Sequence, residues 1–161
     1  INSYSLYADT VDGYLNKTVA EDWSALRQEA MALLQEESGL QEIVSLVGID
    51  ALSEKDRLKL EVAKSIREDY LQQNGFHEID TYTSLDKQYK MLKLVLLFRH
   101  EAERALDAGV YLDKVLALEV RDKIARSKYI HEDDIAKMDD IAAELRADID
   151  TLINEGGVLN A

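Results

Sequence analysis

Apolar residues recur at every third or fourth position along most of the chain, which is typical of amphipathic helices. The first such stretch covers about residues 20–47. Its apolar positions include Trp23, Leu26, Ala30, Leu33, Leu34, Leu40, Ile43, Val44 and Val47. Gly48 follows directly, and glycine is the residue that most often ends a helix. The pattern predicts one long helix with an apolar face, or two helices if the chain bends at Ser38 and Gly39.

A second helix is predicted from Ser53 to about Gln72. Ser53 and Asp56 have the spacing of a helix N-cap signal. The apolar positions that follow are Leu58, Val62, Ala63, Ile66 and Tyr70. The first two helices therefore form a hairpin whose tip is Gly48 to Leu52. Its arms are about 42 and 30 Å long at 1.5 Å per residue, so we expect the tip to stand well away from the rest of the molecule.

The segment 85–108 is predicted to be the central helix of the core. It is apolar on nearly every face between Met91 and Phe98, except at Lys93, and Gly109 ends it. The preceding residues, 73–83, show no sustained period, so we expect a loop that returns to the core.

The C-terminal third is predicted to contain shorter helices at about 112–118 and 120–127, and a last helix from about Glu132 to Asn154. The tail 156–161 is expected to fray. The chain has 7 Gly and no Pro, which favours long helices over rigid turns. We therefore expect an all-α fold, an irregular helical bundle with a long protruding helical hairpin.

Composition narrows the classes of partner. The 161 residues include 32 Asp and Glu against 19 Lys and Arg, a formal charge of −13. Such a charge repels phosphate backbones and anionic lipids, so we expect no nucleic acid partner and no direct membrane insertion. No apolar run approaches the roughly 20 residues that span a bilayer. Because the chain begins with Ile1 and not with Met, we expect it to be a piece of a longer protein.

No catalytic or metal-binding motif is present in the sequence. The residues three positions before His77, His100 and His131 are Asn74, Leu97 and Lys128, so the Glu-x-x-His motif of di-iron bundles is absent. Glycine-rich phosphate loops are also absent, and with no Cys there is no thiolate nucleophile. We therefore expect no catalytic residue, no metal site and no cofactor bound by this chain alone.

One stretch resembles a known family. Gly48-Ile-Asp-Ala-Leu-Ser-Glu-Lys-Asp-Arg-Leu58 looks like the hairpin-tip motif of rotary ATPase catalytic subunits. The sequences around Leu40-Gln-Glu-Ile-Val44, Gln72-Gln-Asn-Gly-Phe76 and Gln88-Tyr-Lys-Met-Leu92 are closest to the catalytic A subunit of V/A-type ATPases. The resemblance covers residues 3 to at least 150. It identifies the chain as similar to the C-terminal helical domain of that subunit.

The resemblance implies a function for the parent subunit. Its P-loop domain, absent here, binds ATP or ADP with Mg, and closure of that site drives rotation of a central-stalk coiled coil that is coupled to proton or sodium transport. Residues 1–19 would then continue from this nucleotide-binding domain, and 20–155 would be the C-terminal helical domain. Further implied partners are the non-catalytic B subunits, and the implied location is cytoplasmic, peripheral to the membrane.

The resemblance also implies two sets of site residues. The residues assigned to central-stalk contact are Gly48, Asp50, Leu52, Ser53, Glu54, Lys55 and Asp56. Phe76 and Tyr82 are assigned to a wall against the adenine of nucleotide in the complete subunit, with closure of the core as the alternative role. Because Lys55 and Arg57 nearly balance the tip acids, we do not expect strong acidic attraction to the stalk.

A different class of function also fits the composition and periodicity. A free-standing acidic helical adaptor could dock a partner helix in a groove. A helical-bundle enzyme is a third class, supported only by scattered carboxylates. Neither alternative explains why several motifs of the A subunit occur in the same order.

Overall fold

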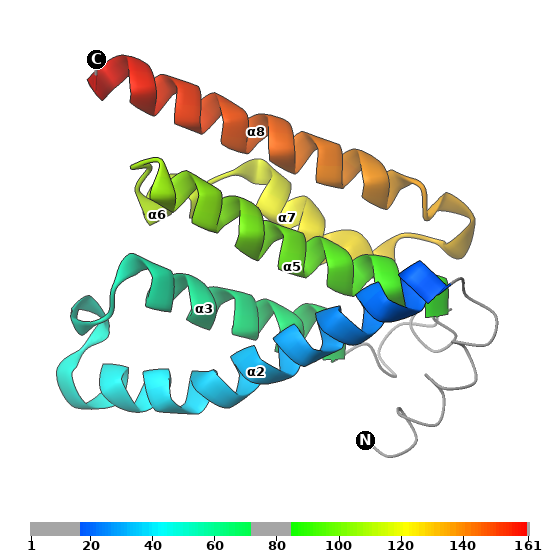
Figure 1. Cartoon of the computed structure of the whole chain (residues 1–161), viewed down its shortest axis with the longest axis horizontal. Coiled ribbons are helices and arrows are strands. Elements are labelled where there is room, and N and C mark those ends of the chain that lie inside the picture. The colour runs from blue at the N-terminus through cyan, green and yellow to red at the C-terminus, as the bar shows by residue number, and fades with distance from the viewer. Residues whose placement is uncertain (1–16, 72–84, 161) are drawn as a thin grey trace.

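The computed structural model describes residues 17–71 and 85–160, and within them the chain forms helices and turns but no strand (Figure 1). The α-helices are α2 (Lys17–Val47), α3 (Glu54–Ser65), α5 (Leu85–Asp107), α6 (Leu112–Leu116), α7 (Glu119–Ala125) and α8 (Lys137–Asn160). Short 3-10 helices are η1 (Ile49–Ala51), η3 (Arg126–Tyr129) and η4 (Glu132–Asp134). The predicted all-α class is confirmed.

Helices α2 and α3 form the predicted hairpin. α2 is one helix of 31 residues that continues through Ser38 and Gly39. Gly48 ends it with a φ of 95°, in the left-handed region that favours glycine. Ser53 caps α3, because its hydroxyl accepts a hydrogen bond from the backbone N–H of Asp56 at 3.2 Å. Both predicted boundaries of the hairpin turn are thus confirmed.

The second arm differs from the prediction. Its α-helical part ends at Ser65, and the next six residues, Ile66–Leu71, form a π-helix, η2. Ile66 remains fully buried. The periodicity missed this change because six residues are too few to distinguish a π-helical period from an α-helical one.

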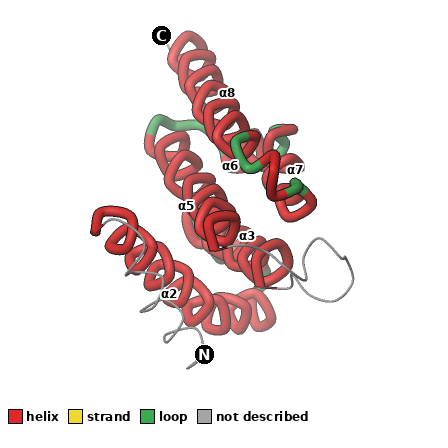
Figure 2. The backbone as a smooth tube through the Cα atoms, turned by 90° about the vertical axis from the view of Figure 1, so that its right-hand side faces the viewer, coloured by secondary structure: helices red, strands yellow, loops and turns green. Residues whose placement is uncertain are grey.

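Helix α5 is the centre of the core, as its apolar sequence predicted. It lies between the α2–α3 hairpin and α8 in both views (Figures 1 and 2). The apolar residues it buries are Met91, Leu92, Leu94, Val95, Leu96, Phe98, Ala102 and Ala105. Leu58 and Val62 of α3 and Leu145 of α8 join the same cluster. The hairpin, α5 and α8 thereby share one hydrophobic core.

The last helix is shifted toward the C-terminus relative to the prediction. It begins at Lys137, after the 3-10 helix η4, and not near Glu132. It also continues to Asn160, past the Gly156-Gly157 pair where we expected a fraying tail. Positive φ among the described glycines occurs only at Gly48 and Gly109, so the pair does not force a turn. The division of the chain at residues 19 and 155 stays a prediction.

Candidate functional site

The hairpin tip carries all the residues predicted to contact a central stalk. Gly48, Asp50, Ser53 and Lys55 are exposed, and Glu54 and Asp56 are half-buried. Leu52 is the exception, because only 8% of its surface is accessible. Its N–H also donates to the carbonyl of Ile49 at 3.1 Å, which closes the turn η1. Leu52 is therefore packed into the turn, and its assignment to the contact surface stays a prediction.

The first turn of α3 is tied to the body. Lys55 pairs with Asp107 at the end of α5 at 2.9 Å, and Arg57 pairs with Asp113 of α6 at 3.5 Å. The hydrogen bond and charge of Asp107 raise the pKa of Lys55 above its ordinary value, so Lys55 stays charged at neutral pH. This part of the tip lies against the bundle. The arm lengths had suggested that the tip would stand well away from it, and for the first turn of α3 that expectation is wrong.

An exposed apolar surface is the most distinctive feature of the tip. It consists of Ile43, Leu46, Val47 and Ile49, which are 41%, 77%, 69% and 46% exposed, and we call it the apolar tip patch. Ile43 and Val47 belong to the apolar face predicted for α2, so that face does not stay buried to the end of the helix. Large apolar side chains grouped on a surface are typical of interaction sites.

Sequence reasoning missed this patch for an identifiable reason. Periodicity placed Ile43 and Val47 on the same face of α2 as buried residues such as Leu33. A residue on that face is buried only where another element packs beside that part of α2. α3 begins only at Glu54, after the turn has already reversed the chain. The usable signal was the pair Leu46-Val47 beside Gly48, because apolar residues directly before a tight turn lack a partner helix.

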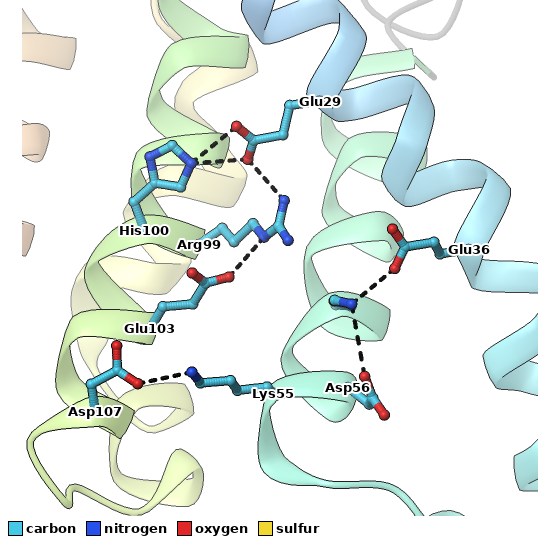
Figure 3. Close-up of polar contacts among 9 residues, drawn as sticks. Glu29, Glu36, Lys55, Asp56, Arg99, His100, Glu103 and Asp107 are labelled. Atoms are coloured by element: carbon cyan, nitrogen blue, oxygen red, sulfur yellow. Dashed lines mark hydrogen bonds and ion pairs between the residues drawn. The ribbon is translucent and has the colours of Figure 1, made fainter.

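Ion pairs fasten the hairpin to α5 along its length (Figure 3). Glu29 of α2 accepts a hydrogen bond from Arg99 at 3.1 Å and contacts the Nε2 of His100 at 3.0 Å. Arg99 also pairs with Glu103 at 3.0 Å. Arg99 and Glu29 are only 19% and 23% exposed, so these contacts are partly shielded from solvent.

The two arms are also joined to each other. Lys59 of α3 pairs with Glu36 of α2 at 2.9 Å and also lies 3.9 Å from Asp56 of its own helix. Below these polar contacts, the apolar residues of α3 enter the same core as α5. The hairpin and α5 are therefore held together by both packing and charge, which suits the transmission of displacement as one body.

Comparison with known protein families assigns this fold. Residues 12–116 match the family described as the C-terminal domain of V and A type ATP synthase. The chain belongs to this family. The resemblance predicted from the tip motif is thus confirmed.

Curated relatives of this V/A-type C-terminal domain agree with the family match. The chain is 72% identical to V-type ATP synthase alpha chains of Clostridium botulinum strain Eklund 17B and Clostridium perfringens strain SM101. It is 67% identical to that of Clostridium botulinum strain Hall. Each alignment covers 100% of this chain but 27% of the relative. The V/A-type C-terminal domain thus spans about a quarter of the length of these alpha chains.

The described part of this domain offers no obvious site for a metal. Within residues 17–71 and 85–160, no three His, Asp or Glu side chains gather in a way that could hold one. Phe76 and Tyr82, assigned to an adenine wall, lie outside the described residues, so their role stays a prediction. Helices in the described ranges are also too short or too polar to cross a membrane.

Proposed function

We propose that this domain is the mechanical output element of the catalytic A (alpha) subunit of a rotary V/A-type ATPase. Closure of a P-loop domain elsewhere in the subunit, around ATP or ADP with Mg, moves the hairpin against a central-stalk coiled coil. Rotation of that stalk is coupled to proton or sodium transport. The chain itself carries no catalytic group in this mechanism; its function depends on stiffness and on the shape of its contact.

The apolar tip patch is the observation that carries this proposal. Leu46 and Val47 are the most exposed of its members, at 77% and 69%, and both precede the rigid turn at Gly48. Burying one such side chain against a partner stabilises the contact by about 1.5–3 kcal/mol. A coiled coil presents apolar and long side chains suited to this contact. The stalk-facing surface therefore centres on the end of α2, with Asp50 and Glu54 at its edge.

Stiffness is the second requirement, and the contacts of the hairpin support it. A displacement of α5 reaches the tip through the ion pairs of Glu29 with Arg99 and of Lys55 with Asp107. The shared core opposes sliding of α3 along α5, because packed interiors deform little. The hairpin would then move with α5 as one body.

The other partners follow from the same assignment. The proposed location of the complex is at the cytoplasmic face of a membrane, with this domain peripheral to it. Non-catalytic B subunits would flank the alpha subunit, and Phe76 or Tyr82 would stack on the adenine of bound nucleotide, a contact worth about 1–3 kcal/mol. A free-standing adaptor is not favoured, because it leaves the 72% identity to alpha chains without explanation.

Serine substitutions in the apolar tip patch test the proposal. In the complete, purified ATPase, Leu46→Ser, Val47→Ser and Ile49→Ser are combined, and ion transport into vesicles is measured per ATP hydrolysed. We expect this ratio to fall below about half of the wild-type value, because the contact loses apolar area at three positions. Hydrolysis itself is expected to persist.

Two control variants make the test specific. Met31→Ser removes an apolar side chain that is 49% exposed on α2 but lies outside the patch. Asp50→Ala with Glu54→Ala removes acids of the tip. Both should leave the transport ratio near the wild-type value. A larger loss in the acid variant than in the patch variant would refute the apolar contact.

A further inference from the structure

A groove between α5 and α8 combines an apolar floor with a cationic rim. It has a volume of about 250 Å³, and its lining includes three cations, Lys90, Lys93 and Arg146, one acid, Asp139, and the apolar residues Leu97, Met138 and Ala142. Met138 is buried, and Leu97 and Ala142 are half-buried. These apolar residues form the floor, while the three cations stand at the edges. We call this feature the α5/α8 groove.

The positive charge of the groove contrasts with the net charge of −13 of the chain. Lys93 is engaged, because it donates to the hydroxyl of Tyr89 at 3.3 Å and lies 3.6 Å from Asp22. Lys90 is paired loosely, with 3.8 Å between its Nζ and the carboxylate of Asp139. Each of the two lysines therefore has one acid nearby, Asp22 for Lys93 and Asp139 for Lys90.

Arg146 is the cation best placed to bind a partner. It is exposed, and none of the ion pairs found among residues 17–71 and 85–160 involves it. Its neighbour four residues later, Asp150, is instead bound by Arg104 at 2.7 Å. A guanidinium binds a carboxylate through two parallel hydrogen bonds, which gives both strength and orientation.

We propose that the α5/α8 groove docks an acidic amphipathic helix from another polypeptide segment of the ATPase complex. A carboxylate of that helix binds Arg146, with Lys90 as a second positive group, and an apolar side chain one turn away covers Leu97 and Ala142. Helices commonly bind grooves in this way, through apolar anchors with charged flanks. Charge complementarity with Arg146, which has no ion-pair partner among the described residues, selects an acidic helix.

This surface is separate from the apolar tip patch. The patch lies at the end of α2 and in η1, whereas the groove is formed by α5 and α8. The inference rests on the proposed function only in taking the rotary complex as the source of the partner. Binding in the groove would anchor α8 to α5, and α8 lies on the opposite side of α5 from the α2–α3 hairpin (Figure 2).

Photo-crosslinking in the complete complex tests the inference. Ala142 is replaced by the photoreactive residue p-benzoylphenylalanine in the full alpha subunit, the purified complex is irradiated, and the crosslinked peptide is identified by mass spectrometry. We expect a product with an Asp- or Glu-rich segment outside this chain. Arg146→Glu in the same background should lower its yield about tenfold, because a charge-assisted contact becomes repulsive.

Matched variants separate binding from loss of structure. Arg146→Lys keeps the charge and should retain part of the yield. Lys114→Glu changes an exposed cation of α6 outside the groove and should leave the yield unchanged. Crosslinks only within this chain, to a second copy, to lipid, or to a segment without acids would overturn the inference, and so would an equal yield in the Arg146→Glu complex. Ion transport per ATP hydrolysed, measured on the same variants, reports separately on the contact at the apolar tip patch.

Discussion

Gly48 determines how the chain leaves α2. Its N–H still donates to the carbonyl of Val44 at 2.9 Å, while its φ of 95° turns the chain into η1. With a ψ of 162°, Gly48 lies in a backbone region that is essentially restricted to glycine, and an L-residue there costs about 1–3 kcal/mol. The direction of the turn, and with it the exposure of Leu46 and Val47, therefore depends on one residue without a side chain.

Two alanine substitutions measure this dependence. Gly48→Ala should lower the free energy of unfolding by about 1–3 kcal/mol, because its φ of 95° and ψ of 162° are tolerated essentially by glycine alone. Gly39→Ala is the matched control: Gly39 lies inside α2, and apart from its chain neighbours and the backbone of its own helix nothing lies within 4 Å of an added Cβ. This control should raise the free energy of unfolding by about 0.5–1 kcal/mol. Urea unfolding monitored by circular dichroism gives both values. If the two substitutions changed the free energy of unfolding in the same direction, this description of the turn would be contradicted.

At the scale of elements, the contact between α2 and α5 has a polar centre. Glu29 contacts both Arg99 and His100, and the side chains of Glu29 and Arg99 are mostly shielded from solvent. Exposed ion pairs contribute about 0–1 kcal/mol, and shielding raises this contribution when the geometry is good. The pair is therefore expected to couple the first arm of the hairpin to the central helix.

A double-mutant cycle tests this coupling. Glu29→Ala, Arg99→Ala and the double variant should give an interaction free energy of about 1 kcal/mol in urea unfolding. The reference cycle uses Asp122 and Arg126, a pair on α7 and its end whose side chains are 70% and 74% exposed. That pair should give less than about 0.5 kcal/mol. A smaller value for Glu29 and Arg99 than for the reference would contradict the coupling.

The elements that sequence could predict are those with local signals. Gly48 and Ser53 define the hairpin turn through their own conformational preferences, and the apolar run from Met91 identified the central helix. Burial at the turn was less predictable, since Leu52 is buried and Val47 exposed although both are apolar. Periodicity shows which residues share a helix face, but not how far a neighbouring helix extends. The π-helix η2 lacks a local signal of any kind.

At the scale of the whole molecule, the domain has two separate surfaces on one core. The α2–α3 hairpin packs on one side of α5, and α8 packs on the other (Figure 1). The two proposals assign the apolar tip patch to a stalk contact and the α5/α8 groove to a partner helix on the opposite side. A force applied at one side would reach the other through α5, because the three elements share the same buried cluster.

The most direct measurement of the central claim is a reversible crosslink at the tip. The chain has no Cys, so Val47→Cys introduces one reactive thiol into this domain of the complete ATPase. Cysteines are placed in turn along the central-stalk coiled coil, and ATP hydrolysis is followed before and after oxidation. The account predicts a disulfide between Val47→Cys and the stalk that stops hydrolysis until a reductant is added, and no such disulfide for Met31→Cys. Absence of any stalk disulfide from position 47, or an equal yield from position 31, would contradict it.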